Sequence, residues 1–389
     1  MRVGIVGGKL QGVEAAYLAR KAGWEVLLVD RRTDVPAMGL CDRFVALDVT
    51  SVRRTAGVLS DADLVIPALE NLPALEVLTA CSRAGGIRLA FDLEAFALTT
   101  SKVRSNGLFE RLGIPVPAKW PGCRLPVIIK PDSASGSRGV RLVAEAEELS
   151  PYESRPSEYV IEAFTPGPSY SIEVLGTPGN HHALQVTALE MDTDFDCKRV
   201  TAPAGLDLNL EQRFADLAVR LAAAVSLKGV MDVEAVLHQG ELKVLEIDAR
   251  LPSQTPTAVY WSTGVNMVDL LDRLSAGRRI RPPSTAGGRA VIFEHIRVSG
   301  MRLETAGEHI MAGWGPLEIK PGFFGADEAL TTYRPGRADW VATLVFADRD
   351  LRSVRSRRNA AVAAICRHCR VEQVVDPGPT VAHVRERHP

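Results

Sequence analysis

The most constraining feature of the sequence is the segment 232–250, in which two alternating apolar and charged stretches flank Gln239-Gly240. This pattern predicts a β-hairpin. Side chains two residues apart lie on one face of a strand, so Glu246 and Asp248 share a face. A three-residue loop would place Glu234 opposite Glu246, whereas a two-residue loop would shift Glu234 by one position. The sequence leaves both registers open.

Three carboxylates on one hairpin face repel one another unless a cation lies between them. A ligand set of oxygen atoms without Cys or His indicates Mg²⁺, with Mn²⁺ as a further candidate. We therefore expect Glu234, Glu246 and Asp248 to bind metal, although Asp232 lies on the same face and parity does not choose among the acids. Arg250 follows on this face, where it can stabilise charge on a phosphoryl group or an acyl phosphate. The alternative is a solvent-exposed acidic hairpin face.

A second motif is the segment 128–140, where a strand ending in Lys130 leads into a Ser/Gly-rich loop and a further strand. Small residues let backbone N–H groups wrap around phosphate oxygens, while Lys130 supplies a positive charge at a triphosphate. The loop residues that we expect at the nucleotide are Ser133, Ser135, Gly136 and Ser137. No Gly-Lys-Ser/Thr precedes a helix, so this is not a Walker loop. Taken alone, the segment is also compatible with a simple hairpin connection.

The N-terminal segment alternates strands, expected at 2–6, 25–29, 43–47 and 63–67, with helices, which predicts a parallel, doubly wound sheet. The turn Gly7–Gly12 follows the first strand, but Lys9 occupies the position where a dinucleotide site needs glycine. Bound NAD is therefore disfavoured. Polar residues end successive strands at Lys9, Asp30, Asp48 and Glu70-Asn71, in the crevice where such sheets bind ligands. We expect a zwitterionic ligand there; solvated loop residues are the alternative.

The chain divides into three expected units: a Rossmann-like unit at 1–90, a middle unit at 91–166 and a C-terminal unit at 167–389. The middle unit is expected to begin with one helix over 92–112. Further along, Pro282-Pro283 and Gly287-Gly288 indicate a loop, and the residues after Asp376 are expected to form a frayed tail.

Composition excludes several partner classes. The 46 basic and 47 acidic residues give a net charge of −1, which argues against nucleic acid or an anionic membrane as the main partner. No apolar run approaches the roughly 20 residues that span a bilayer. The start of the chain reads as a first strand and not as a signal peptide, so we expect a cytoplasmic protein.

Taken together, the motifs resemble the ATP-grasp family of carboxylate–amine ligases. Their order along the chain agrees over about 90–270, namely Lys102, Lys130 with its loop, 158–164, Glu173, and Glu234 to Arg250. The resemblance implies an α/β (α+β) ATP-grasp fold with a pre-grasp domain, and ATP and Mg²⁺ as cofactors. Lys102 and Lys130 would contact phosphates, and Glu162, Ala163 and Phe164 would form the adenine hinge. Many members carry Asn where this chain has Asp248.

Three local segments, 7–17, 228–235 and 246–258, resemble more closely the ligases of pyrrolysine biosynthesis, which join 3-methyl-D-ornithine to the ε-amine of L-lysine. This likeness implies two small-molecule sites. L-Lysine would lie near Leu10, Gln11, Gly12, Glu70 and Asn71. The D-ornithine moiety would lie near Tyr170, Ser171, Ile172, Glu173, Arg250, Ser253, Gln254 and Thr255.

The resemblance implies that the ornithine carboxylate attacks the γ-phosphate while Mg²⁺, Lys130 and Arg250 neutralise the moving charge. The lysine amine, with an ordinary pKa near 10.4, must then lose its proton to a group that the sequence does not identify. Three alternatives remain open: another ATP-grasp amino-acid ligase, a carboxylase that makes carboxyphosphate from bicarbonate, and a nucleotide-binding dehydrogenase or sensor that uses only the N-terminal sheet.

Overall fold

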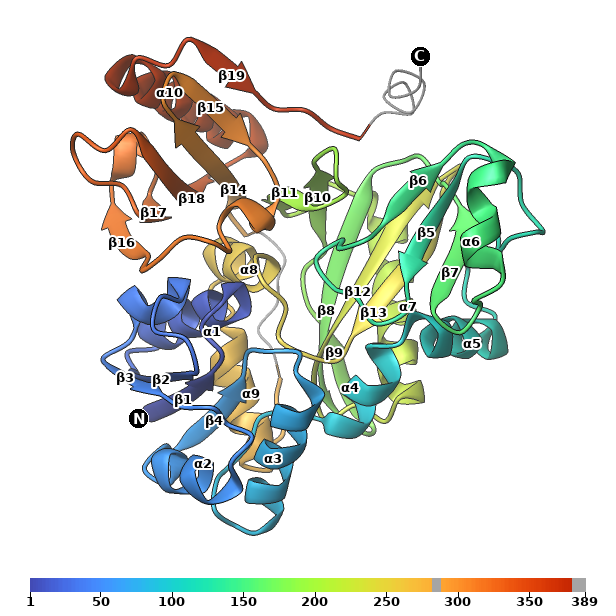
Figure 1. Ribbon diagram of the computed structural model, residues 1–389, viewed down its shortest axis with the longest axis horizontal. Coiled ribbons are helices and arrows are strands. Elements are labelled where there is room, and N and C mark those ends of the chain that lie inside the picture. Colours follow the sequence, from blue (N-terminus) through green and yellow to red (C-terminus); the bar gives the residue numbers. More distant parts are fainter. Residues whose placement is uncertain (282–287, 380–389) are drawn as a thin grey trace.

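The computed structural model describes residues 1–281 and 288–379. Most of the expected loop at 282–288 and the tail from 380 onward lie outside the described residues. Within them, the strands form a four-stranded, a three-stranded and a twelve-stranded sheet (Figure 1). No helix in this part of the chain is long and apolar enough to cross a bilayer.

The N-terminal sheet is parallel, with strand order β3-β2-β1-β4. Its elements are β1 (Arg2–Val6), α1 (Leu10–Lys21), β2 (Glu25–Asp30), η1 (Pro36–Leu40), β3 (Arg43–Ala46), α2 (Val52–Leu59), β4 (Leu64–Pro67) and α3 (Leu72–Arg83). All four expected strands are present to within one residue at each end. Gly7 has φ +107°, and a Cβ on Gly12 would lie 2.1 Å from the Gly7 carbonyl oxygen. Glycine at these positions therefore lets α1 begin close against the sheet.

The expected single helix over 92–112 is wrong, because the chain forms α4 (Leu93–Thr99) and α5 (Lys102–Leu112). The side chain of Ser101 accepts the N–H of Arg104 at 3.2 Å and so caps α5. Asp132 reinforces this start by accepting the Ser101 hydroxyl at 2.8 Å. The break places Lys102 in the first turn of α5, beside the loop that follows β5.

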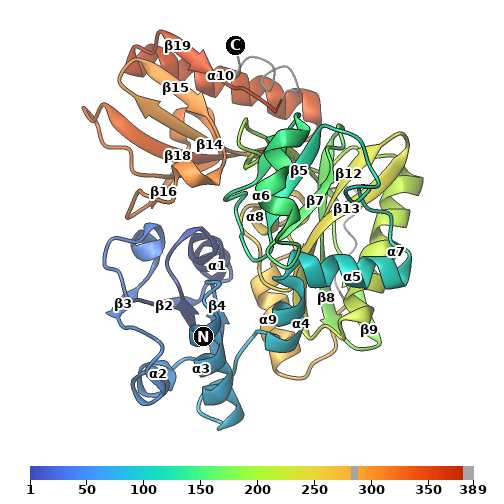
Figure 2. The ribbon, with the colours of Figure 1, turned by 45° about the vertical axis from the view of Figure 1, so that its right-hand side comes forward.

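The three-stranded sheet has order β6-β5-β7 and comprises β5 (Val127–Pro131), β6 (Arg141–Val143) and β7 (Tyr159–Ala163), with η2 (Ala146–Leu149) and α6 (Ser150–Glu153) between the last two. Figures 1 and 2 show this sheet beside the hairpin β12–β13. One direct link is the ammonium of Lys130, which donates to the carbonyl oxygen of Leu245 in that hairpin at 3.3 Å.

The large sheet runs β13-β12-β8-β10-β11-β14-β18-β17-β16, with β9 beside β8, β15 beside β14 and β19 beside β15. Helices α8 and α9 pack between α1 and this sheet, and α10 covers β14 and β18. The strands are β8 (Ser169–Thr177), β9 (Asn180–Ala183), β10 (Thr187–Met191), β11 (Cys197–Ala202), β12 (Gly229–His238), β13 (Glu241–Asp248), β14 (Ala290–Ser299), β15 (Arg302–Thr305), β16 (Glu318–Pro321), β17 (Glu328–Thr331), β18 (Asp339–Asp348) and β19 (Gln373–Val375). The helices are α7 (Leu208–Ala224), α8 (Thr255–Thr263), α9 (Met267–Ser275), α10 (Leu351–Cys369), η3 (Glu308–Ile310) and η4 (Phe323–Gly325).

The hairpin β12–β13 resolves the two registers that the sequence left open. His238 pairs with Glu241, so the turn has two residues, and both Gln239 and Gly240 have positive φ. Pairing then shifts at a bulge beside Leu245, and beyond it Glu234 lies opposite Glu246. The turn is the shorter alternative, but the bulge restores the pairing that the longer loop would have given.

Candidate active site

Four carboxylates lie on one face of β12–β13, the face we call the acid face: Asp232, Glu234, Glu246 and Asp248. Asp232 is paired with Asp248, and Glu234 with Glu246. Adjacent β8 contributes Ser171, whose hydroxyl donates to Asp232, and Glu173, which lies opposite Asp232. The three expected metal ligands therefore lie together, with Asp232 as a fourth acid.

The electrostatics of the acid face favour a bound cation. Burial, followed by repulsion from Glu246 and Asp232, raises the pKa of Glu234 well above its ordinary value. Burial also raises the pKa of Asp248 to about 7, against the attraction of Arg250. The pKa of Glu246 is lowered, because Lys102 and Lys130 outweigh the opposing effect of burial. A divalent cation would remove this repulsion, and the all-oxygen donor set fits Mg²⁺.

Two lysines flank the acid face. The ammonium of Lys102 lies 3.1 Å from a carboxylate oxygen of Glu246 and donates to the Ala134 carbonyl at 2.7 Å. The ammonium of Lys130 lies 2.6 Å from a carboxylate oxygen of Glu162. Both lysines are thus mostly buried between the small sheet and the hairpin.

The loop between β5 and β6, which we call the Ser/Gly loop (133–138), accepts the ammonium of Lys102 at the Ala134 carbonyl and borders a cleft. Ser135 and Gly136 line the cleft, whereas Ser133 donates to Asp132 and Ser137 donates to the Phe195 carbonyl. The loop therefore reaches from the small sheet to the turn between β10 and β11.

The expected hinge, Glu162 to Phe164, runs along the end of β7. The side chain of Glu162 is buried against Lys130. The N–H groups of Ala163 and Phe164 already donate to the carbonyls of Ala118 and Pro126, at 2.8 and 3.0 Å. The carbonyl oxygen of Ala163 accepts the Thr165 hydroxyl at 3.2 Å, and the ring of Phe164 packs edge-on against Phe195.

Arg250 connects the acid face to the N-terminal sheet. Its guanidinium lies 2.8 Å from Glu70 and 3.1 Å from Asp248. The amide of Gln11 also donates to Glu70, at 2.8 Å. Arg250, Ser135 and Gln11 counter the effect of burial and hold the pKa of Glu70 below its ordinary value.

A cleft of about 620 Å³ opens between the N-terminal sheet, the Ser/Gly loop and η3. Among the residues expected at the amine substrate, Leu10, Gln11, Glu70 and Asn71 line it. Gly12 does not line it, because Gly12 is buried against Gly7. The amide oxygen of Asn71 is occupied as the cap of α3, accepting the Ala74 N–H at 3.0 Å.

Four of the residues expected at the carboxylate substrate lie on β8, where successive side chains point to opposite faces of the strand. Tyr170 and Ile172 point into the apolar core beneath β8, so their side chains do not face the acid face. Ser171 and Glu173 do. Both carboxylate oxygens of Glu173 are buried without a hydrogen-bond partner among the described residues, and burial raises its pKa to about 8.

Residues at the start of α8 complete this region. Gln254 has φ +76°, a strained conformation for a residue other than glycine. Ser253 and Gln254 both donate to a carboxylate oxygen of Glu308, at 2.6 and 3.2 Å, and the hydroxyl of Thr255 has no described partner. Glu308 is not among the residues predicted from the sequence, because it lies in a three-residue 3₁₀ helix without a motif. No signal in the sequence marks it.

Comparisons with known proteins agree with this geometry. Residues 99–254 match the ATP-grasp domain family. The 3-methyl-D-ornithine–L-lysine ligase of Methanosarcina mazei is 33% identical over 93% of this chain and 94% of its own length. The corresponding ligase of Methanosarcina acetivorans is also 33% identical, over 92% and 96%.

The biotin carboxylase domain of a 2-oxoglutarate carboxylase from Hydrogenobacter thermophilus has a TM-score of 0.71 at 17% identity, covering 93% of this chain and 89% of that one. Such a likeness shows the fold alone. Enzymes of this fold generally use ATP and Mg²⁺. The chain has the ATP-grasp fold with an N-terminal parallel sheet, and it belongs to the family of 3-methyl-D-ornithine–L-lysine ligases.

Proposed function

We propose that this enzyme joins the carboxylate of 3-methyl-D-ornithine, or of D-ornithine, to the ε-amine of L-lysine through an acyl phosphate. The observation that carries the proposal is that Arg250 links the acid face, with its two lysines, to Glu70 in the wall of a cleft at the N-terminal sheet. The acid face with its lysines can activate a carboxylate, and the cleft can admit an amine. The relatives named for this reaction support the choice of substrates.

The acid face is the metal site of this proposal. Glu234, Glu246 and Asp248 hold Mg²⁺, or Mn²⁺, which when bound neutralises phosphate oxygens of ATP. Lys102 and Lys130 contact the phosphates. Their present partners, Glu246 and Glu162, keep both ammonium groups at this edge of the hairpin.

The nucleotide lies between the small sheet and the hairpin. Ser133, Ser135, Gly136 and Ser137 offer hydroxyl and N–H groups to phosphate oxygens from the Ser/Gly loop. Glu162, Ala163 and Phe164 border the adenine. In this segment, recognition through the main chain uses carbonyl oxygens, because the N–H groups of Ala163 and Phe164 are already bonded.

The ornithine moiety and L-lysine bind at adjoining sites. The ornithine moiety lies over the acid-face side of β8 and the start of α8, where the carboxylate of Glu173 has no partner for its charge. An ammonium group would supply that partner. L-Lysine enters the cleft beside Gln11 and Glu70. Arg250, between the two places, neutralises the carboxylate during phosphoryl transfer.

The deciding experiment measures ADP release with ATP and Mg²⁺ in the presence of D-ornithine plus L-lysine, of each amino acid alone, and of bicarbonate. We expect turnover to require both amino acids. Bicarbonate-dependent release would identify a carboxylase instead and reject the proposal. Glu246→Ala should abolish turnover by removing a metal ligand, and retained activity would show that Glu246 does not hold the metal.

A further inference from the structure

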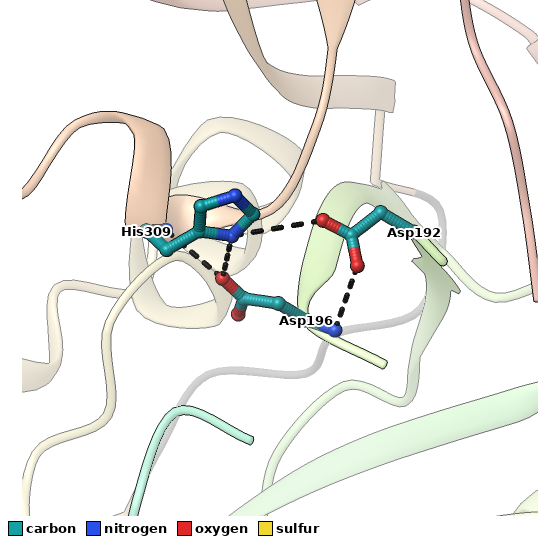
Figure 3. Close-up of side chains that lie close together, drawn as sticks. All are labelled: Asp192, Asp196 and His309. Carbon is teal, nitrogen blue, oxygen red and sulfur yellow. Dashed lines mark hydrogen bonds and ion pairs between the residues drawn. The ribbon is translucent and has the colours of Figure 1, made fainter. Parts of the chain in front are cut away.

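In the wall of the cleft, a histidine is fixed by two aspartates (Figure 3). Asp192 and Asp196 belong to the turn between β10 and β11, and His309 belongs to η3. The Nδ1 atom of His309 lies 2.7 Å from Asp196 Oδ2 and 3.6 Å from Asp192 Oδ2. The main-chain N–H of His309 donates to the same Asp196 oxygen at 2.9 Å. The imidazole is therefore held through one nitrogen and through its own backbone.

The hydrogen bonds of this cluster argue against a metal site. Asp192 accepts main-chain N–H groups from Asp194, Asp196 and Gly307, at 2.8, 3.1 and 2.8 Å. A Cβ on Gly307 would lie 2.4 Å from Asp196, so the turn and η3 are in close contact. The carboxylates are occupied in holding two segments together, and the arrangement orients the histidine.

The other ring nitrogen of His309 is free. No residue in the described ranges hydrogen-bonds its Nε2 atom, and the side chain is 50% exposed. His309 lines the same cleft as Gln11 and Glu70, where the amine of L-lysine is proposed to enter. The imidazole thus borders both the cleft and the solvent.

The carboxylates that line the cleft are otherwise engaged. Asp30 accepts the Gly8 N–H, Asp48 accepts the Thr50 N–H, and Asp196 is bonded to His309. Glu70 accepts the Gln11 amide and forms an ion pair with Arg250. Glu308 accepts hydrogen bonds from Ser253 and Gln254. Among the titratable groups that can accept a proton here, His309 combines a free nitrogen with an orienting partner.

We propose that His309, oriented by Asp196, accepts the proton that the attacking amine releases; this assignment rests on the proposed function. The ε-ammonium of L-lysine gives one proton to Nε2 of His309, and the lone pair so freed forms the C–N bond to the acyl carbon. The C–O bond to phosphate breaks, its electron pair leaves with the phosphate, and the phosphate carries away the second N–H proton. Asp196 stabilises the imidazolium, and the half-exposed ring then passes the proton to water.

The charges around the ring favour this role. Asp192, Asp194 and Asp196 face it from the turn, and Glu308 adjoins it on η3. The basic groups that line the same cleft are Lys9, Arg31, Arg32 and Arg138, and His295 of β14 interacts electrostatically with the ring. The hydrogen bond to Asp196 comes first among the causes that raise the pKa of His309 above 6.5. The neutral acceptor is present above this raised pKa and is lost as the pH falls through it.

The test compares two nucleophiles, L-lysine and hydroxylamine, with D-ornithine and ATP from about pH 6 to about pH 9. Hydroxylamine is uncharged at neutral pH and attacks an acyl phosphate without a strong base. We expect His309→Asn to lower kcat/KM for L-lysine by about 10²–10⁴-fold while hydroxamate formation stays within about threefold. Asp196→Asn should move the acidic limb of the lysine profile to lower pH.

The control is His368→Asn, an exposed histidine on α10 with one side-chain partner, Tyr333, which should leave both rates unchanged. The acidic limb set by His309 should be present in the wild-type profile with L-lysine and lost in His309→Asn, whereas the hydroxylamine rate, referred to its uncharged form, should have the same pH profile in both enzymes. An unchanged lysine rate in His309→Asn, or an equal loss of both products, overturns the assignment. Failure of the wild-type enzyme to form either product overturns the proposed function, and the assignment with it.

Discussion

Arg250 is the residue in which the two halves of the proposed site meet. It forms ion pairs with Glu70 from the N-terminal sheet and with Asp248 from the acid face. Its side chain is 14% exposed, so neither carboxylate is well screened by water. The guanidinium is therefore fixed before substrates bind, as electrostatic stabilisation of a developing charge requires.

Replacement of this charge should affect the chemical step. We expect Arg250→Met to lower kcat for ADP release with both amino acids by about 10²–10³-fold, the usual loss when one preorganised stabilising group is removed. Arg273→Met is the control, because Arg273 forms an exposed ion pair with Asp269 on α9 at 3.0 Å. A change confined to KM, with kcat intact, would assign Arg250 to substrate binding alone.

The alternation of side chains along a strand predicts which face some of the site residues occupy, but it says nothing about residues outside strands. The alternation of β13 is enough to bring Glu246 and Asp248 to one face, and they lie there. The same rule could have separated Tyr170 and Ile172, which lie in the core, from Ser171 and Glu173. Glu308 and His309 follow no periodic pattern. They reach the cleft through contacts with residues that are more than 50 positions away in the chain.

Among the elements, the strands of the N-terminal sheet were predictable because each is a short apolar run that ends at a polar residue. Two details do not follow from this rule. The break at Thr100-Ser101 depends on Asp132, a distant residue that bonds both the Ser101 hydroxyl and the Val103 N–H. The bulge beside Leu245 leaves a mark in the sequence, because the consecutive apolar residues Val244 and Leu245 interrupt the alternation there.

The contact between α1 and α8 contains a buried acid. Glu14 of α1 accepts the N–H of Thr257 in the first turn of α8, where main-chain N–H groups lack helical partners. Burial raises the pKa of Glu14 to about 7, from an ordinary value of 4.5. The folded protein thus holds this proton to a higher pH than the unfolded chain does.

This difference predicts a pH-dependent stability. The contribution of Glu14 to stability is complete below about pH 4.5 and lost as the pH rises through 7, on the order of 3 kcal/mol in total. Glu14→Gln is neutral at every pH and keeps an oxygen for the Thr257 N–H. Urea denaturation should therefore show similar stabilities at about pH 5 and a more stable variant at about pH 8. Exposed Glu76→Gln on α3 should show no such trend, and a pH-independent difference for Glu14→Gln would contradict the assignment.

At the scale of the whole molecule, the N-terminal unit shares an apolar core with α8 and α9, and polar contacts between residues far apart in sequence add to this attachment. Tyr17 and Lys21 of α1 both donate to Glu328 of β17, each at 2.6 Å. Arg88 donates to Asp272 of α9, also at 2.6 Å. The division into three units stays a prediction from the sequence, and no periodicity in the sequence pairs Lys21 with Glu328. The shape of the cleft depends on these contacts.

Weakening this attachment should affect the amine substrate more than the carboxylate substrate. Glu328→Gln removes the charge that pairs with Lys21, and because Glu328 is only 14% exposed we expect a loss of about 1–3 kcal/mol in the free energy of unfolding. The KM for L-lysine should rise, since the cleft lies between the N-terminal sheet and η3. Hydroxamate formation from D-ornithine and hydroxylamine should stay close to wild type, because the acid face lies within the large sheet.

The matched variant is Glu318→Gln on neighbouring β16, whose ion pair with Arg334 is exposed and does not involve the N-terminal unit. Loss of such a pair should cost less than about 1 kcal/mol and leave the KM for L-lysine unchanged. If Glu318→Gln and Glu328→Gln changed the free energy of unfolding and the KM for L-lysine equally, the contacts of β16 and β17 would stabilise only the large sheet. A rise in KM for L-lysine with Glu328→Gln alone would show that the amine site depends on how the N-terminal unit is docked.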